Sequence, residues 1–174
     1  MQTYDLILNL AEDLIEKHQT NDPKIILKER GVFLIPFRRP TKLLGMYTKI
    51  KSSRFVLYNP NLSEQMLRMV FAHELGHDVL HQEEANEKHL HEFQLFDIKT
   101  RLETEANLFA CHLLIDEKNL LSLGNSGYTY DQIAAKLGVN INLLFFKISE
   151  LNRRGQKLNF YEPTNNSFFS KLNL

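Results

Sequence analysis

Two histidines and a glutamate lie within five consecutive positions of this chain, in the segment 73–77, which reads His-Glu-Leu-Gly-His. The surrounding residues 70–81 predict a helix, in which side chains four positions apart share one face. His73 and His77 would therefore stand one above the other, which is the spacing that two imidazoles need to bind one zinc ion. Glu74 would point to the side, where its carboxylate can reach a water molecule beside the metal. The alternative is a pair of packed or solvated histidines that bind no metal.

A catalytic zinc normally takes a third protein ligand and keeps one position open for water. The segment 101–110 predicts a helix that carries two carboxylates. Glu103 falls on the apolar face of this helix, whereas Glu105 is rotated by about 200° and faces outward. A carboxylate among apolar side chains needs a partner, because burying it unpaired is costly. We therefore expect Glu103 to be the third ligand; the alternatives are Glu105, or two solvated glutamates on a merely amphipathic helix.

Other polar side chains near these motifs are expected to support the metal site. Asn107 lies one turn beyond Glu103 and can hydrogen-bond a ligating histidine. His81 lies one turn beyond His77, but a fourth nitrogen would close the open position, so we expect it to support the structure or a ligand. Four tyrosines are candidates for stabilising an oxyanion, and the sequence does not choose between them: Tyr47, Tyr58, Tyr128 and Tyr130.

The remaining elements predict an α+β fold. Apolar spacing predicts a first helix that ends near His18, and Asp22-Pro23 has the residue types that begin a second one. The zinc-site helix follows a small antiparallel sheet, and Ser63 is its expected N-cap. The strands of this sheet are expected at 32–37, 43–50 and 54–58.

The rest of the chain predicts a loop followed by helices. The polar segment 82–96, which contains His89 and His91, is interpreted as a loop. A helix is expected over 98–115, and two more after Thr129 and Asn140. We divide the chain into a domain that carries the candidate zinc site, 1–125, and a C-terminal helical region with its tail, 126–174.

The composition excludes several classes of protein. The 174 residues include 21 basic and 21 acidic side chains, so the zero net charge provides no strong field toward nucleic acid or a membrane. No apolar run approaches the roughly 18 residues of a membrane-spanning helix. Cys111 is the only cysteine, which excludes an internal disulfide and a cysteine-based zinc cluster. We expect a cytoplasmic protein that does not interact with a membrane.

The two motif segments together resemble the ImmA/IrrE metallopeptidases. One block is Phe-Ala-His-Glu-Leu-Gly-His at 71–77, and the other is Glu-x-Glu-Ala-Asn-x-Phe-Ala at 103–110. The resemblance extends over 31–151. The chain departs from the family at 115–116, where Ile-Asp replaces a common Met-Pro or similar pair.

This resemblance implies a zincin-like fold and a function. The ligands of Zn²⁺ would be His73, His77 and Glu103, with Glu74 as the catalytic glutamate. The enzyme would cleave a protein substrate at a specific site, typically a helix-turn-helix repressor of a phage, a mobile element or a stress response.

A DNA-binding regulator is the main alternative, because 131–151 has the helix-glycine-helix rhythm of a helix-turn-helix. Its would-be recognition helix is apolar over 143–148 and carries few cations before Arg153-Arg154, whereas phosphate contacts dominate DNA affinity. We therefore expect no direct nucleic-acid binding, and a C-terminal region that recognises the partner protein through any apolar residues that stay exposed. A third possibility is a protein with a structural zinc site that only docks a repressor.

Overall fold

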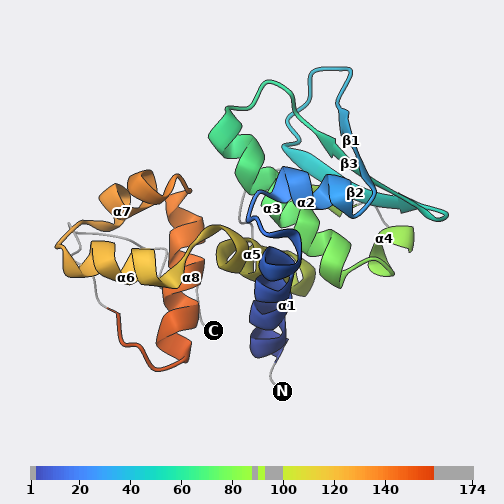
Figure 1. Cartoon of the computed structure of the whole chain (residues 1–174). Helices are drawn as coiled ribbons and strands as arrows, with labels where there is room; N and C mark the ends of the chain where they lie inside the picture. Colours follow the sequence, from blue (N-terminus) through green and yellow to red (C-terminus); the bar gives the residue numbers. More distant parts are fainter. Residues whose placement is uncertain (1–2, 88–89, 93–99, 159–174) are drawn as a thin grey trace. The chain divides into compact units, whose positions relative to one another are not determined.

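The computed structural model describes residues 3–87, 90–92 and 100–158 of a chain that divides into two compact units, 1–114 and 115–174. The described part confirms the predicted α+β class, with the sheet in the first unit and helices in both (Figure 1). The sequence favoured a division after residue 125, which assigns 115–125 to the first of the two predicted domains. That boundary stays a prediction.

Two helices of the first unit begin at the caps that the sequence predicts. Asp22 accepts a hydrogen bond from the backbone N–H of Lys24, and Ser63 accepts one from that of Met66, so both predicted N-caps are confirmed. These caps satisfy backbone donors that have no partner inside the helix. The helices are α1 (Thr3–His18), α2 (Pro23–Glu29), α3 (Glu64–Leu80), α4 (Glu84–Glu87) and α5 (Arg101–Leu114).

The described sheet is mixed, so the prediction of an antiparallel sheet was wrong. Its strands are β1 (Val32–Pro36), β2 (Gly45–Ile50), β3 (Ser53–Tyr58) and β4 (Leu90–Glu92), in the order β1-β3-β2-β4. β2 forms a hairpin with β3 and is also antiparallel to β4, whereas β1 pairs in parallel with β3. The connection 37–44 places β2 on the far side of β3, so β1 meets the second strand of the hairpin instead of the first.

The segment 82–96, predicted to be a loop, contains both α4 and β4. β4 pairs with β2, whose edge backbone groups need hydrogen-bond partners whatever side chains the added strand carries. A polar composition therefore did not reveal this strand. His91 lies in β4 opposite Met46, and His89 lies outside the described residues.

A buried ionic cluster attaches α3 to the sheet. The fully buried Asp78 carboxylate of α3 accepts hydrogen bonds from Arg30 Nε at 2.7 Å, Arg54 Nη1 at 3.0 Å and the Tyr47 hydroxyl at 2.9 Å. Burial, and then the Asp78 charge, raises the pKa of Tyr47 above its ordinary value, so the hydroxyl stays protonated and donates. The cluster fixes one side of α3 while its histidines face another.

Replacing Asp78 by alanine is expected to lower the free energy of unfolding by about 3–5 kcal/mol, because it leaves two partly buried guanidinium groups without their shared carboxylate. Chemical denaturation of the metal-free protein measures this change. Tyr47→Phe removes a single hydrogen bond and should cost about 1 kcal/mol. A loss of only about 1 kcal/mol in both variants would show that the two ion pairs add no stability beyond the single hydrogen bond of Tyr47.

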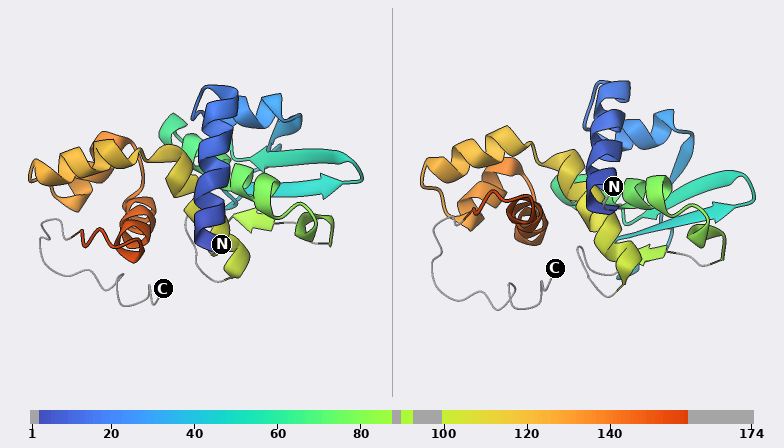
Figure 2. Two further views of the ribbon diagram at one scale, coloured as in Figure 1. Left: turned by 60° about the horizontal axis from the view of Figure 1, so that its bottom comes forward. Right: turned by 90° about the horizontal axis from the view of Figure 1, so that it is seen from below.

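Close packing brings α5 against α3, and α1 covers another side of α5 (Figure 2). A Cβ atom at Gly76 of α3 would lie only 3.0 Å from Ala106 Cα of α5. The absence of a side chain at Gly76 therefore lets the two helices approach closely, which brings the polar residues of α5 near the histidines of α3.

The second unit contains α6 (Glu117–Asn125), α7 (Tyr130–Leu137) and α8 (Ile141–Arg153). The predicted capping box of Thr129 and Gln132 is present, and Gly138 ends α7 with φ of +65°. All six residues 143–148 of α8 are buried, so this apolar run is not an exposed anchor for a partner. None of the helices in the described residues is long and apolar enough to cross a membrane.

Candidate metal centre

The structure brings His73 and His77 of α3 together with Glu103 of α5. The Nε2 atoms of the two histidines are 3.0 Å apart. Glu103 Oε2 lies 3.1 Å from His73 Nε2, and Glu103 Oε1 lies 3.6 Å from His77 Nε2. The imidazoles are almost fully buried, whereas 17% of the Glu103 side chain is exposed. Three potential ligand side chains therefore converge at a place that solvent reaches beside Glu103.

These separations fit a zinc ion. Bonds of about 2.0–2.1 Å in tetrahedral geometry separate neighbouring ligand atoms by about 3.3 Å. The Nε2–Nε2 separation of 3.0 Å, and the separations of 3.1 and 3.6 Å from these nitrogens to the two oxygens of Glu103, lie close to this value. Two imidazoles and one carboxylate are also a donor set of catalytic zinc sites, which leaves a fourth position for water. The arrangement supports the predicted ligand set of His73, His77 and Glu103, which stays a proposal.

The protonation states of the group also favour a metal ion. Burial lowers the pKa of His77 to about 4, so its imidazole is neutral at neutral pH. Burial alone would raise the pKa of Glu103, but the close contacts of its carboxylate with the His73 and His77 imidazoles outweigh burial and hold the pKa well below its ordinary value. Neutral imidazole and ionised carboxylate are the forms that coordinate metals.

Asn107 orients one of the two imidazoles, as the sequence predicted. His73 Nδ1 lies 2.7 Å from Asn107 Oδ1, and Asn107 is fully buried on α5. An amide oxygen can only accept, so Nδ1 carries the proton and Nε2 is left with a lone pair toward His77 and Glu103.

Glu74 is buried between α3 and the start of β2. A Cβ atom at Gly45 would lie 2.5 Å from Glu74 Oε1 and 2.6 Å from Val70 Cγ1. The missing side chain at Gly45 thus leaves the space that the carboxylate occupies. Sequence analysis missed Gly45, although a glycine within a strand is a known sign of close approach by another group.

Glu105 was expected to face outward, and this expectation was wrong. It is 9% exposed, and its Oε2 lies 3.0 Å from His81 Nε2. Helical periodicity identified the more apolar side of α5, but it could not show that the opposite side is covered as well. His81 supports a candidate ligand, as predicted, because its Nδ1 lies 2.9 Å from His77 Nδ1.

Of the four tyrosines that could stabilise an oxyanion, the structure argues against Tyr47. The Tyr47 hydroxyl binds Asp78, which commits it to the ionic cluster. The Tyr58 ring packs edge-on against Phe71 with centroids 5.1 Å apart. Tyr128 and Tyr130 belong to the second unit, where they contact Lys136 and Phe145.

Comparisons with known proteins agree with the resemblance noted in the sequence. The family model described as the IrrE N-terminal-like domain matches residues 28–149. Uncharacterized immunity region protein 2 of Bacillus phage phi105 is 33% identical over 149 residues, which cover 85% of this chain and 93% of that protein. Metallopeptidase ImmA of Bacillus subtilis strain 168 is 27% identical over 164 residues, which cover 90% of this chain and 92% of that protein.

Proposed function

This chain belongs to the ImmA/IrrE-like metallopeptidase family, and we propose that it is a zinc-dependent endopeptidase of the cytoplasm that cleaves a transcriptional repressor. The observation that carries the proposal is the convergence of His73, His77 and Glu103, with Glu74 next to the first of them on α3. This is a zincin-like arrangement in which a glutamate supplies the third ligand.

His73, His77 and Glu103 would hold one zinc ion per chain. When bound, zinc supplies a Lewis acid that polarises the scissile carbonyl and lowers the pKa of water toward about 7. The two imidazoles contribute no charge in their neutral forms, and Glu103 contributes one negative charge, so a net positive charge is left to act on the substrate.

Glu74 would act as the general base and then as the general acid. The water oxygen forms a bond to the carbonyl carbon while the Glu74 carboxylate takes a proton from that water. When the carbon–nitrogen bond breaks, Glu74 delivers the proton to the leaving amine. Its burial beside Gly45 supports this role, because a carboxylate held in a fixed place needs little reorganisation during the reaction.

A repressor is the substrate class that the family resemblance favours, and the immunity-region name of the phage relative supports it. The direct test is to incubate the purified protein with regulators encoded beside its gene and to map the products by mass spectrometry. We expect cleavage at one site, loss of cleavage with a chelator, and recovery when zinc is restored. Intact regulators under all these conditions would contradict the proposed substrate class.

The alternative of a DNA-binding regulator finds less support in α8. This helix buries 143–148, Arg153 Nε pairs with Glu150 at 2.8 Å, and Arg154 Nη2 pairs with Glu117 at 2.7 Å. Such a helix offers few side chains for base edges and phosphates. We propose that 129–154 contributes to recognising the repressor without reading DNA. A salt-sensitive, sequence-specific shift of duplex DNA by the purified protein would favour the regulator instead.

Replacing Gly45 by alanine is expected to reduce repressor cleavage by about tenfold or more while zinc stays bound, because the added methyl group displaces the Glu74 carboxylate. Single-turnover cleavage and metal analysis measure the two effects. Met46→Ala, at the next position of β2, controls for a general disturbance of the strand. Wild-type cleavage by the Gly45→Ala protein would show that the position of Glu74 does not depend on this close contact.

A further inference from the structure

A continuous row of polar contacts runs from the candidate metal centre to the surface of the first unit. His77 Nδ1 lies 2.9 Å from His81 Nδ1, and His81 Nε2 lies 3.0 Å from Glu105 Oε2. The other oxygen of this carboxylate, Glu105 Oε1, accepts a hydrogen bond from Arg101 Nη1 at 2.9 Å. The row thus joins the C-terminal end of α3 to the first turns of α5.

Only one placement of the protons fits these contacts and a metal ion together. A metal at His77 Nε2 requires the lone pair there, so the proton of the neutral ring is on Nδ1 and is donated to His81. His81 must then accept at Nδ1 and carry its own proton on Nε2, which donates to Glu105. His77 and His81 thus each donate once toward Glu105, and Arg101 donates to the same carboxylate from the other side.

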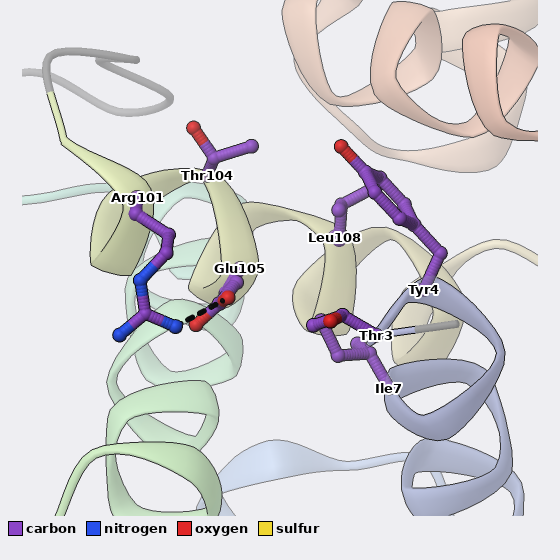
Figure 3. Close-up of a pocket in the computed structure, with 7 residues that line it drawn as sticks. All are labelled: Thr3, Tyr4, Ile7, Arg101, Thr104, Glu105 and Leu108. Carbon is purple, nitrogen blue, oxygen red and sulfur yellow. Dashed lines mark hydrogen bonds and ion pairs between the residues drawn. The ribbon is translucent and has the colours of Figure 1, made fainter. Parts of the chain in front are cut away.

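The contacts between His77, His81 and Glu105 are buried, so solvent screens them little. His81 is 2% exposed and Glu105 is 9% exposed, whereas 72% of the Arg101 side chain is exposed. Figure 3 shows Arg101 and Glu105 on α5, at a pocket of about 280 Å³ whose other wall is formed by Thr3, Tyr4 and Ile7 of α1. Water therefore reaches the outer end of the row, while the contacts between His77, His81 and Glu105 are shielded from it.

We propose that His81 and Glu105 are positioning residues that fix the ring orientation and tautomer of His77 for the metal, with the charge of Glu105 acting through His81. The inference deepens the proposed function and rests on its metal site. It also assigns different roles to the two glutamates of α5: Glu103 binds the metal, and Glu105 supports a ligand from outside. The two imidazoles are then supported differently, since His73 donates to the neutral amide of Asn107.

Zinc affinity of the folded protein tests this assignment, measured by competition with a chromophoric chelator. Glu105→Gln preserves the size of the side chain and removes its charge, and we expect it to weaken zinc binding by about 10–100-fold. The matched control is Glu83→Gln, which removes the same charge two residues beyond His81, from a side chain that is 87% exposed. We expect the control to change zinc affinity by less than about twofold, because solvent screens exposed charges.

A second pair of variants separates positioning from a purely structural role. His81→Gln can still offer an acceptor oxygen to His77, whereas His81→Leu cannot, so the glutamine variant should retain more zinc affinity than the leucine variant. Nuclear magnetic resonance of the ring nitrogens gives an independent signature: in the zinc-loaded protein, His81 should carry its proton on Nε2. A residue that only stabilises the fold would lower the unfolding temperature of the metal-free protein and leave these two measurements unchanged.

The outcomes distinguish this inference from the proposed function. If Glu105→Gln and Glu83→Gln bind zinc equally well, or if the His81 proton resides on Nδ1, the positioning role is overturned while the metal site stands. If the wild-type protein binds no zinc, the proposed metal site itself has failed. Weaker binding in Glu105→Gln alone, together with the Nε2 tautomer of His81, supports the inference.

Discussion

Glu74→Gln is expected to abolish detectable proteolysis while leaving the fold and the bound zinc intact. The amide has nearly the shape of the carboxylate, but it cannot accept the proton of the attacking water. General acid–base catalysis contributes about 10²–10⁴-fold to rates, so kcat should fall by at least this order. Single-turnover cleavage of the repressor, together with metal analysis of the same preparation, measures both quantities.

The control for this variant is Glu64→Gln, which makes the same change in the exposed first turn of α3. It should cleave at the wild-type rate. Cleavage by Glu74→Gln within about tenfold of the wild-type rate would identify another group as the general base. Loss of zinc from Glu74→Gln would instead show that this side chain takes part in holding the metal.

Glu103→Ala is expected to lose most of its zinc, and the wild-type protein to bind about one zinc ion per chain. The substitution removes the only anionic member of the group and leaves two neutral imidazoles, which hold zinc weakly. Zinc should therefore raise the unfolding temperature of the wild-type protein and have little effect on the variant, since a ligand stabilises only the state that binds it. Elemental analysis and thermal unfolding with and without zinc measure the two effects.

The comparison with Glu105 makes this prediction specific. Glu105→Gln should weaken zinc binding, but by less than Glu103→Ala, because its carboxylate contacts His81 and not the converging nitrogens. The reverse order of zinc affinities would exchange the roles of the two glutamates. It would overturn the ligand set without changing the family of the protein.

The sequence by itself predicted the features that depend on local chain geometry. A helical repeat places His73 and His77 on one face without reference to the rest of the fold, and the caps at Ser63 and Thr129 form within a few residues. For the same reason, the α+β class and most helix positions could be predicted from periodicity. The preference for Glu103 over Glu105 also came from helical rotation, and the structure does place Glu103 beside both histidines.

The features that join distant segments of the chain became known from the three-dimensional arrangement alone. The parallel pairing of β1 with β3 depends on how the chain crosses the sheet, and the sequence pattern of each strand is the same for either direction. The burial of Glu105 depends on α1 and on the end of α3, which the periodicity of α5 cannot report. The space that Gly45 leaves for Glu74 depends on the distance between β2 and α3. Such contacts are set by packing between elements, so a local signal such as a glycine in a strand does not identify the partner that it meets.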